Sequence, residues 1–85
     1  MNPLQMKMAR VGLNWGVRDL AAAAKVTANT IVRIENGSDA KRSTMLSIQN
    51  ALEIGYDTGD GVWCFAEFPA ENTVKIVFGK APDED

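Results

Sequence analysis

The chain has 85 residues, a formal net charge of −2, 46% hydrophobic residues and 24% charged residues, values typical of one small globular domain. It contains no histidine and one cysteine, which excludes a Cys/His zinc site, an internal disulfide and histidine-based catalysis. We therefore expect no enzyme, no metal site and no cofactor. No apolar run approaches the ~20 residues that cross a membrane, and the first residues lack the pattern of a signal peptide, so we expect a cytoplasmic protein.

The charge is distributed unevenly along the chain. Residues 1–55 hold seven Lys or Arg and four Asp or Glu, a net charge of 7 − 4 = +3. Residues 56–85 hold two Lys or Arg and seven Asp or Glu, a net charge of 2 − 7 = −5. A cationic N-terminal part is compatible with an anionic ligand such as nucleic acid, although ordinary variation in surface charge remains an alternative explanation.

Apolar residues follow helical spacing from Pro3 to about Ile54 and predict four helices. Asn2 and Pro3 predict the start of the first. Residues 14–16 separate it from the second, Asn36-Gly37 ends the third, and Arg42 or Ser43 opens the fourth, with Ser43 the better cap. The faces expected to be buried are Leu4, Met8 and Val11; Val17, Leu20, Ala21 and Ala24; Ile31 and Ile34; and Met45, Ile48 and Leu52.

The pattern changes to alternation after a connection, residues 55–61, that is rich in glycine and aspartate and is expected to hold no regular element. Residues 62–68 and 73–78 alternate like strands and predict a hairpin over about 62–78, with a turn at 69–72. The expected organisation is a helical domain at 1–55, followed at 56–85 by a linker, the hairpin and an acidic tail.

The predicted hairpin carries large apolar side chains on both faces, and a two-stranded ribbon has open edges. We therefore expect the hairpins of two chains to pair in a homodimer. The alternative is that Trp63 and Phe65 only cover the core of their own chain. Cys64 is interpreted as a small buried hydrophobe. The expected dimerisation residues are Trp63, Phe65, Val74, Ile76 and Phe78.

Residues 17–37 are predicted to form two short helices joined by a tight turn, the layout of a helix-turn-helix. With the flanking segments, roughly residues 4–54, the sequence strongly resembles the Cro/cI-like (XRE) family of helix-turn-helix regulators. The residues that carry the resemblance are Ala21, Val26, Thr27, Ile31, Ile34 and the ending Arg33-Ile-Glu-Asn-Gly37. Lys25 departs from the glycine usual in the family, which adopts a left-handed conformation. The resemblance implies a mostly α fold, with a four-to-five-helix lambda-repressor-like domain before the hairpin.

The third helix would then be the one that enters the major groove of DNA. Asn29 suits adenine and Arg33 suits guanine, while small apolar side chains suit the thymine methyl group. The alternatives are that Asn29 and Thr30 are ordinary polar surface and that Arg33 pairs with Glu35 or Asn29. The expected base-reading residues are Ala28, Asn29, Val32 and Arg33, and the expected contacts to the DNA backbone are Arg18, Thr27, Thr30, Lys41, Arg42 and Ser43.

For Glu35 the expected partner is Arg10 or Arg42, and its role is structural. The resulting hypothesis is a sequence-specific regulator of transcription, most simply a repressor that binds a palindromic operator as a homodimer. The resemblance makes a bacterial or phage origin plausible, with the protein on the nucleoid when bound. Two alternatives are the antitoxin of a toxin–antitoxin pair, and a protein-interaction module of the same fold that binds no DNA.

Overall fold

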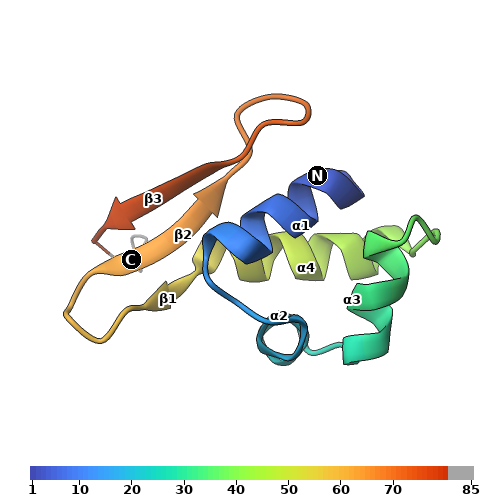
Figure 1. Ribbon diagram of the computed structural model, residues 1–85, viewed down its shortest axis with the longest axis horizontal. Helices are drawn as coiled ribbons and strands as arrows, with labels where there is room; N and C mark the ends of the chain where they lie inside the picture. Colours follow the sequence, from blue (N-terminus) through green and yellow to red (C-terminus); the bar gives the residue numbers. More distant parts are fainter. Residues whose placement is uncertain (81–85) are drawn as a thin grey trace.

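The computed structural model describes residues 1–80 and shows four helices followed by a three-stranded antiparallel sheet (Figure 1). The predicted acidic tail beyond residue 80 lies outside the described residues. The helices are α1 (Pro3–Gly12), α2 (Val17–Ala24), α3 (Ala28–Glu35) and α4 (Arg42–Ile54), and the strands are β1 (Tyr56–Asp57), β2 (Trp63–Glu67) and β3 (Lys75–Gly79). Four helices and a C-terminal hairpin were predicted, and both are present.

Local signals start and stop the helices largely where the sequence predicts. Asn2 caps α1 by accepting a hydrogen bond from the Gln5 backbone N–H at 2.8 Å, with Pro3 in the first turn. Gly37, with φ +94°, follows the end of α3. α4 begins at Arg42, one of the two predicted starts, but the preference for Ser43 as its cap was wrong, because Lys41 is the N-cap residue. The Lys41 carbonyl already accepts from the Met45 N–H at 3.0 Å, so helical hydrogen bonding begins before Ser43.

The core lies where the helices meet each other and the sheet. Leu20, Ile31, Ile48 and Leu52 are almost fully buried, which confirms the predicted inner faces of α2, α3 and α4. The prediction for α1 was wrong: Leu4 and Val11 are 54% and 60% exposed. The buried face of α1 instead consists of Gln5, Met6 and Ala9, with Leu13 after the helix end.

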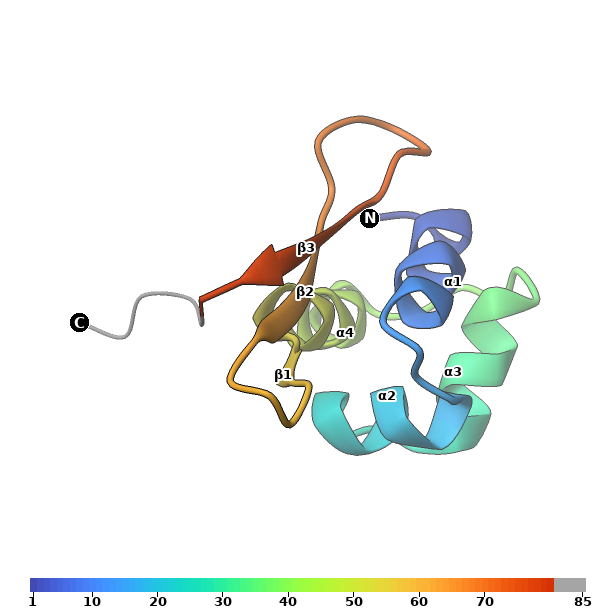
Figure 2. The ribbon, with the colours of Figure 1, turned by 60° about the vertical axis from the view of Figure 1, so that its left-hand side comes forward.

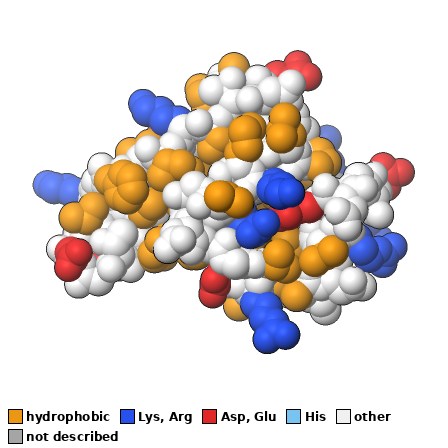
Figure 3. All heavy atoms as spheres, viewed as in Figure 1, with side chains coloured by type: hydrophobic (Ala, Val, Ile, Leu, Met, Phe, Trp, Pro, Cys, Tyr) orange, Lys and Arg blue, Asp and Glu red, His pale blue; other side chains and the backbone are white. Residues whose placement is uncertain are grey.

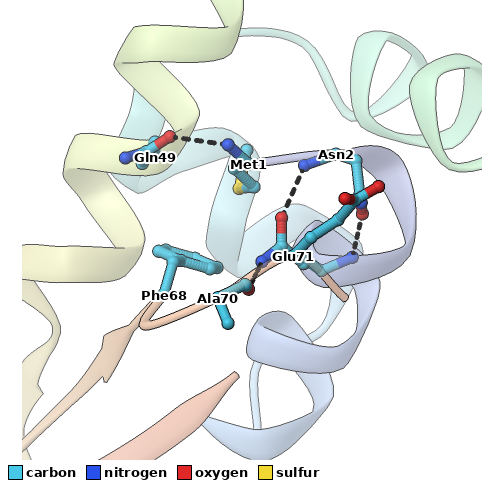
Figure 4. Close-up of a pocket in the computed structure, with 7 residues that line it drawn as sticks. Met1, Asn2, Gln49, Phe68, Ala70 and Glu71 are labelled. Atoms are coloured by element: carbon cyan, nitrogen blue, oxygen red, sulfur yellow. Dashed lines mark hydrogen bonds between the residues drawn. The ribbon is translucent and has the colours of Figure 1, made fainter. Parts of the chain in front are cut away.

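A buried glutamine explains part of the reversal on α1. The Gln5 side-chain amide donates hydrogen bonds to the carbonyl oxygens of Ala70 and Thr73, at 2.8 and 3.0 Å, and thereby ties α1 to the β2–β3 loop. Because both donors are used, this polar side chain is buried without leaving an unsatisfied group. A cavity of about 550 Å³ opens beside this junction, between the start of α1, α4 and the loop after Phe68 (Figure 4).

The sheet has the order β1-β2-β3, so β3 forms one edge and β2 lies in the middle (Figure 1). β1 corrects the expectation that residues 55–61 hold no regular element. It was missed because two residues carry no detectable alternation. Cys64 and Ala66 of β2 face the core and are each 1% exposed. Burial raises the pKa of the Cys64 thiol, as expected for a buried hydrophobe rather than a reactive thiolate.

The alternation of the strands divides the predicted dimerisation residues between the two faces of the sheet. Ile76 is the cross-strand partner of buried Ala66, and both Ile76 and Val74 pack against the core. Trp63 and Phe65 lie on the opposite face and are half-buried. The five residues therefore do not form one surface, because the helices already occupy the inner face. Phe78, 65% exposed, remains accessible near the end of β3.

Candidate nucleic-acid interface

The turn between α2 and α3 sets the position of α3. Lys25 ends α2 in the left-handed conformation, with φ 59° and ψ 41°. This is the conformation that the resemblance in sequence implied for position 25, where glycine is usual. The Lys25 N–H and that of Val26 donate to the Ala22 and Ala21 carbonyls at 3.3 and 3.0 Å, which closes the helix end. Non-glycine residues pay a modest strain for this conformation. The chain is therefore redirected within Lys25–Thr27, and α3 runs in a clearly different direction from α2 (Figure 2).

Thr27 is the N-cap residue of α3, as predicted. Its hydroxyl accepts a hydrogen bond from the Thr30 N–H at 3.2 Å and lies 2.8 Å from the Thr30 hydroxyl. Because the two hydroxyls carry two protons and share one in this contact, one O–H remains available to an acceptor outside the protein. The pair of hydroxyls therefore keeps one donor for a phosphate contact.

The residues of α3 are divided between a core face and an outer face. Ile31 and Ile34 are 0% and 2% exposed. Asn29, Val32 and Arg33 are exposed, and Val32 is 41% exposed. Ala28 differs from the other three predicted base-reading residues, because it is half-buried and packs against the core. The accessible face of α3 thus combines an amide, a small apolar side chain and a guanidinium.

The alternative pairing of Arg33 with Glu35 does not occur. Glu35 is occupied by Arg10, whose Nε and Nη2 donate to Oε2 and Oε1 at 2.7 and 3.0 Å. A third donor, Nη1, reaches the Trp15 carbonyl oxygen at 3.0 Å. The hydrogen bond with Glu35 is the main reason that the pKa of Arg10 is raised. Among residues 1–80, the Arg33 side chain has no hydrogen bond or ion pair, so its guanidinium donors are free.

A groove of about 270 Å³ joins α3 to the start of α4 and brings together residues that were predicted separately. Thr30, Arg33 and Lys41 line it, with Thr44 from the first turn of α4. Asp39 also lines this groove, and the sequence interpretation assigned it no role. Its carboxylate places a negative charge beside the two cations, which reduces the positive potential there.

The N-terminus of α4 forms one end of this surface. No side chain caps it, so the first backbone N–H groups of the helix have no side-chain acceptor. Lys41, Arg42 and Ser43 are all exposed around it. Together with the helix dipole, free N–H groups and cations favour an anion at this position.

Arg18 is exposed near the start of α2. The neighbouring carboxylate of Asp19 accepts a hydrogen bond from the Gly16 N–H at 2.7 Å and so stabilises the N-terminus of α2. On the face of the molecule seen in Figure 3, Lys and Arg side chains lie over both the helices and the sheet, and they form no continuous basic patch on that face.

Comparisons of this chain with the models of known protein families, with the curated proteins and with the solved structures found no match. Within residues 1–80, no helix is long and apolar enough to cross a membrane. In the same residues, no group of three or more potential ligand side chains is placed to hold a metal ion.

Proposed function

We propose that this protein is a sequence-specific DNA-binding regulator of transcription with a lambda-repressor-like helix-turn-helix domain, in which α3 enters the major groove. The observation that carries the proposal is the division of α3: Ile31 and Ile34 are buried, while Asn29 and Arg33 project with their donors unused. An exposed amide and guanidinium four residues apart lie on one side of a helix and match the pairings of adenine and guanine.

The flanking residues support the contacts to phosphate that such docking needs. Thr27 and Thr30 stand at the start of α3, Arg18 at the start of α2, and Lys41 and Arg42 at the uncapped start of α4. Such contacts position a protein on DNA without reading its sequence. The net charge of +3 over residues 1–55 is in keeping with this role.

The first prediction concerns base reading. Replacing Arg33 or Asn29 by alanine is expected to weaken binding to the preferred duplex by ~1–3 kcal/mol, because each removes a bidentate pair, and to weaken binding to random duplex much less. Fluorescence anisotropy measures both affinities, once the preferred duplex has been selected from a random pool.

Lys80→Ala is the matched control, since it also removes one exposed cation and directly follows β3, whose end lies on the side of the molecule away from α3 (Figure 1). It should leave the discrimination between the two duplexes unchanged. Equal losses on both duplexes for the Arg33 and Asn29 variants would rule out base reading by these residues.

The proposed DNA complex contains a homodimer joined through the sheet. β3 is an edge strand with an exposed Phe78, and Trp63 and Phe65 are half-buried on the outer face. Pairing of two β3 edges around a two-fold axis would bury the Phe78 side chain and pair the free backbone groups of this edge, while Trp63 and Phe65 stay on the outer face of β2. It would also present two copies of α3, which read a palindromic operator when they lie about one DNA turn, ~34 Å, apart. Occupying an operator makes repression the simplest outcome.

The second prediction tests this dimer. Sedimentation equilibrium is expected to give twice the mass of the chain, and Phe78→Ser is expected to weaken the dimer about 10-fold or more, because a phenyl ring leaves the interface. Val32→Ser, which removes an exposed apolar side chain from α3, should not change the mass. A monomer at high concentration would contradict the dimer.

A further inference from the structure

Asp39 is a charged residue of the candidate DNA surface that the contacts proposed so far leave without a role. It lies in the segment between α3 and α4 and lines the groove of about 270 Å³ together with Thr30, Arg33 and Lys41. Asp39 is exposed, and so are Arg33 and Lys41. The groove therefore places a carboxylate among the side chains that the proposed function directs to bases and phosphates.

No contact among residues 1–80 explains the carboxylate of Asp39. Two other aspartates have structural roles, because Asp19 and Asp57 each accept a hydrogen bond from a nearby backbone N–H, at 2.7 and 2.8 Å. Within the same residues, the Asp39 side chain accepts no hydrogen bond, forms no ion pair and does not cap α4. Its oxygens are therefore free to accept a hydrogen bond from a group outside the protein.

A free carboxylate at this position weakens the binding of DNA in general. Phosphates are negatively charged, and Asp39 reduces the attraction of the neighbouring Lys41 for them. Moving the carboxylate out of water also costs free energy unless a donor replaces the lost water. Binding that ignores sequence supplies no such donor, so Asp39 has a net cost on a random duplex.

One base offsets this cost. In the major groove, cytosine presents the donor of its N4 amino group, and the carboxylate of Asp or Glu is the acceptor that suits it. Arg33, which lines the same groove, suits the acceptors of guanine. A side chain that disfavours most ligands and finds compensation in one of them increases discrimination more than affinity.

We propose that Asp39 is a specificity-determining residue, whose carboxylate accepts a hydrogen bond from the N4 amino group of a cytosine near the base that Arg33 contacts. The inference rests on the proposed function, because it requires α3 to lie in the major groove. It adds an acceptor to the donors of Asn29 and Arg33 and so favours cytosine at one further position of the site. It also gives a role to an acidic residue on a surface whose other proposed contacts are neutral or basic.

Asp39→Asn tests this role, because it removes the charge, keeps the shape and changes the preferred base from cytosine to adenine. The parent and the variant each select duplexes from a random pool, and the selected duplexes are sequenced. The variant is expected to prefer adenine in place of cytosine at one position for each bound copy of the chain, with the other positions unchanged. Fluorescence anisotropy is expected to show about 3-fold tighter binding to random duplex, and no tighter binding to the duplex that the parent prefers.

Asp60→Asn is the matched control, because it removes one exposed carboxylate from the loop between β1 and β2, outside this groove. It should change neither the selected sequence nor the affinity for random duplex, and circular dichroism reports whether both variants are folded. Selected bases that Asp39→Asn leaves unchanged would overturn the role of Asp39, whatever the effect on affinity, while binding by the parent would still support the proposed function. If the parent bound no duplex, the proposed function itself would fail, and this inference with it.

Discussion

Replacing Arg10 by methionine is expected to lower the free energy of unfolding by about 3–5 kcal/mol, because it leaves the Glu35 carboxylate buried without a partner. The side chains of Arg10 and Glu35 are 12% and 9% exposed and share two hydrogen bonds. The third bond, to the Trp15 carbonyl, holds the connection between α1 and α2 and is lost as well. Urea denaturation followed by circular dichroism measures the change.

The control for this variant is Arg18→Met, which removes an exposed arginine from α2. It should change the unfolding free energy by no more than about 0.5 kcal/mol. Because the pKa of Arg10 is raised in the folded state, its contribution is fully present at neutral pH and is lost only as the pH rises through that pKa. An Arg10 variant within 1 kcal/mol of the parent would contradict the structural role of the pair.

Gly55→Ala is expected to destabilise the protein by about 3 kcal/mol or more, which combines backbone strain with overpacking. Gly55 has φ +69° and ψ −148°, a conformation open in practice only to glycine. A Cβ at this position would also overlap the backbone carbonyl of Cys64, which cannot move without breaking the β1–β2 pairing. Thermal unfolding measures the effect.

Gly59→Ala separates the two causes. Gly59 also has a positive φ, +100°, but a Cβ there meets nothing within 4 Å. It should therefore show strain alone, about 1–3 kcal/mol, and less than the Gly55 variant. If the two variants were equally stable, the close approach of Gly55 to β2 would not be a constraint on the fold.

Helical periodicity was sufficient to predict the helices and the inner faces of α2, α3 and α4. Each of these helices has one apolar stripe, and that stripe packs against the core. Periodicity failed for α1, where Leu4 and Val11 suggest one face and the buried Gln5 lies on another. The helical spacing of apolar residues does not predict that a side-chain amide will be buried. The two donors of that amide are satisfied by the carbonyls of Ala70 and Thr73, which are distant in sequence.

The candidate DNA surface was predictable to a similar degree. Helical spacing alone places Asn29 and Arg33 together on α3. The choice of Arg10 rather than Arg42 as the partner of Glu35 depended on tertiary packing, and so did the partial burial of Ala28. The short strand β1 was not predictable, because its two residues show no alternation and its place depends on the turn of the chain at Gly55 after α4.

The salt dependence of binding to a random DNA duplex tests the central claim most directly. Phosphate contacts release counterions, so the logarithm of the association constant should fall steeply and linearly with the logarithm of salt concentration between about 50 and 200 mM. Lys41→Ala should weaken binding to all duplexes alike and flatten the slope by about 1. No saturable binding at about 50 mM salt, or binding that salt does not weaken, would contradict the account.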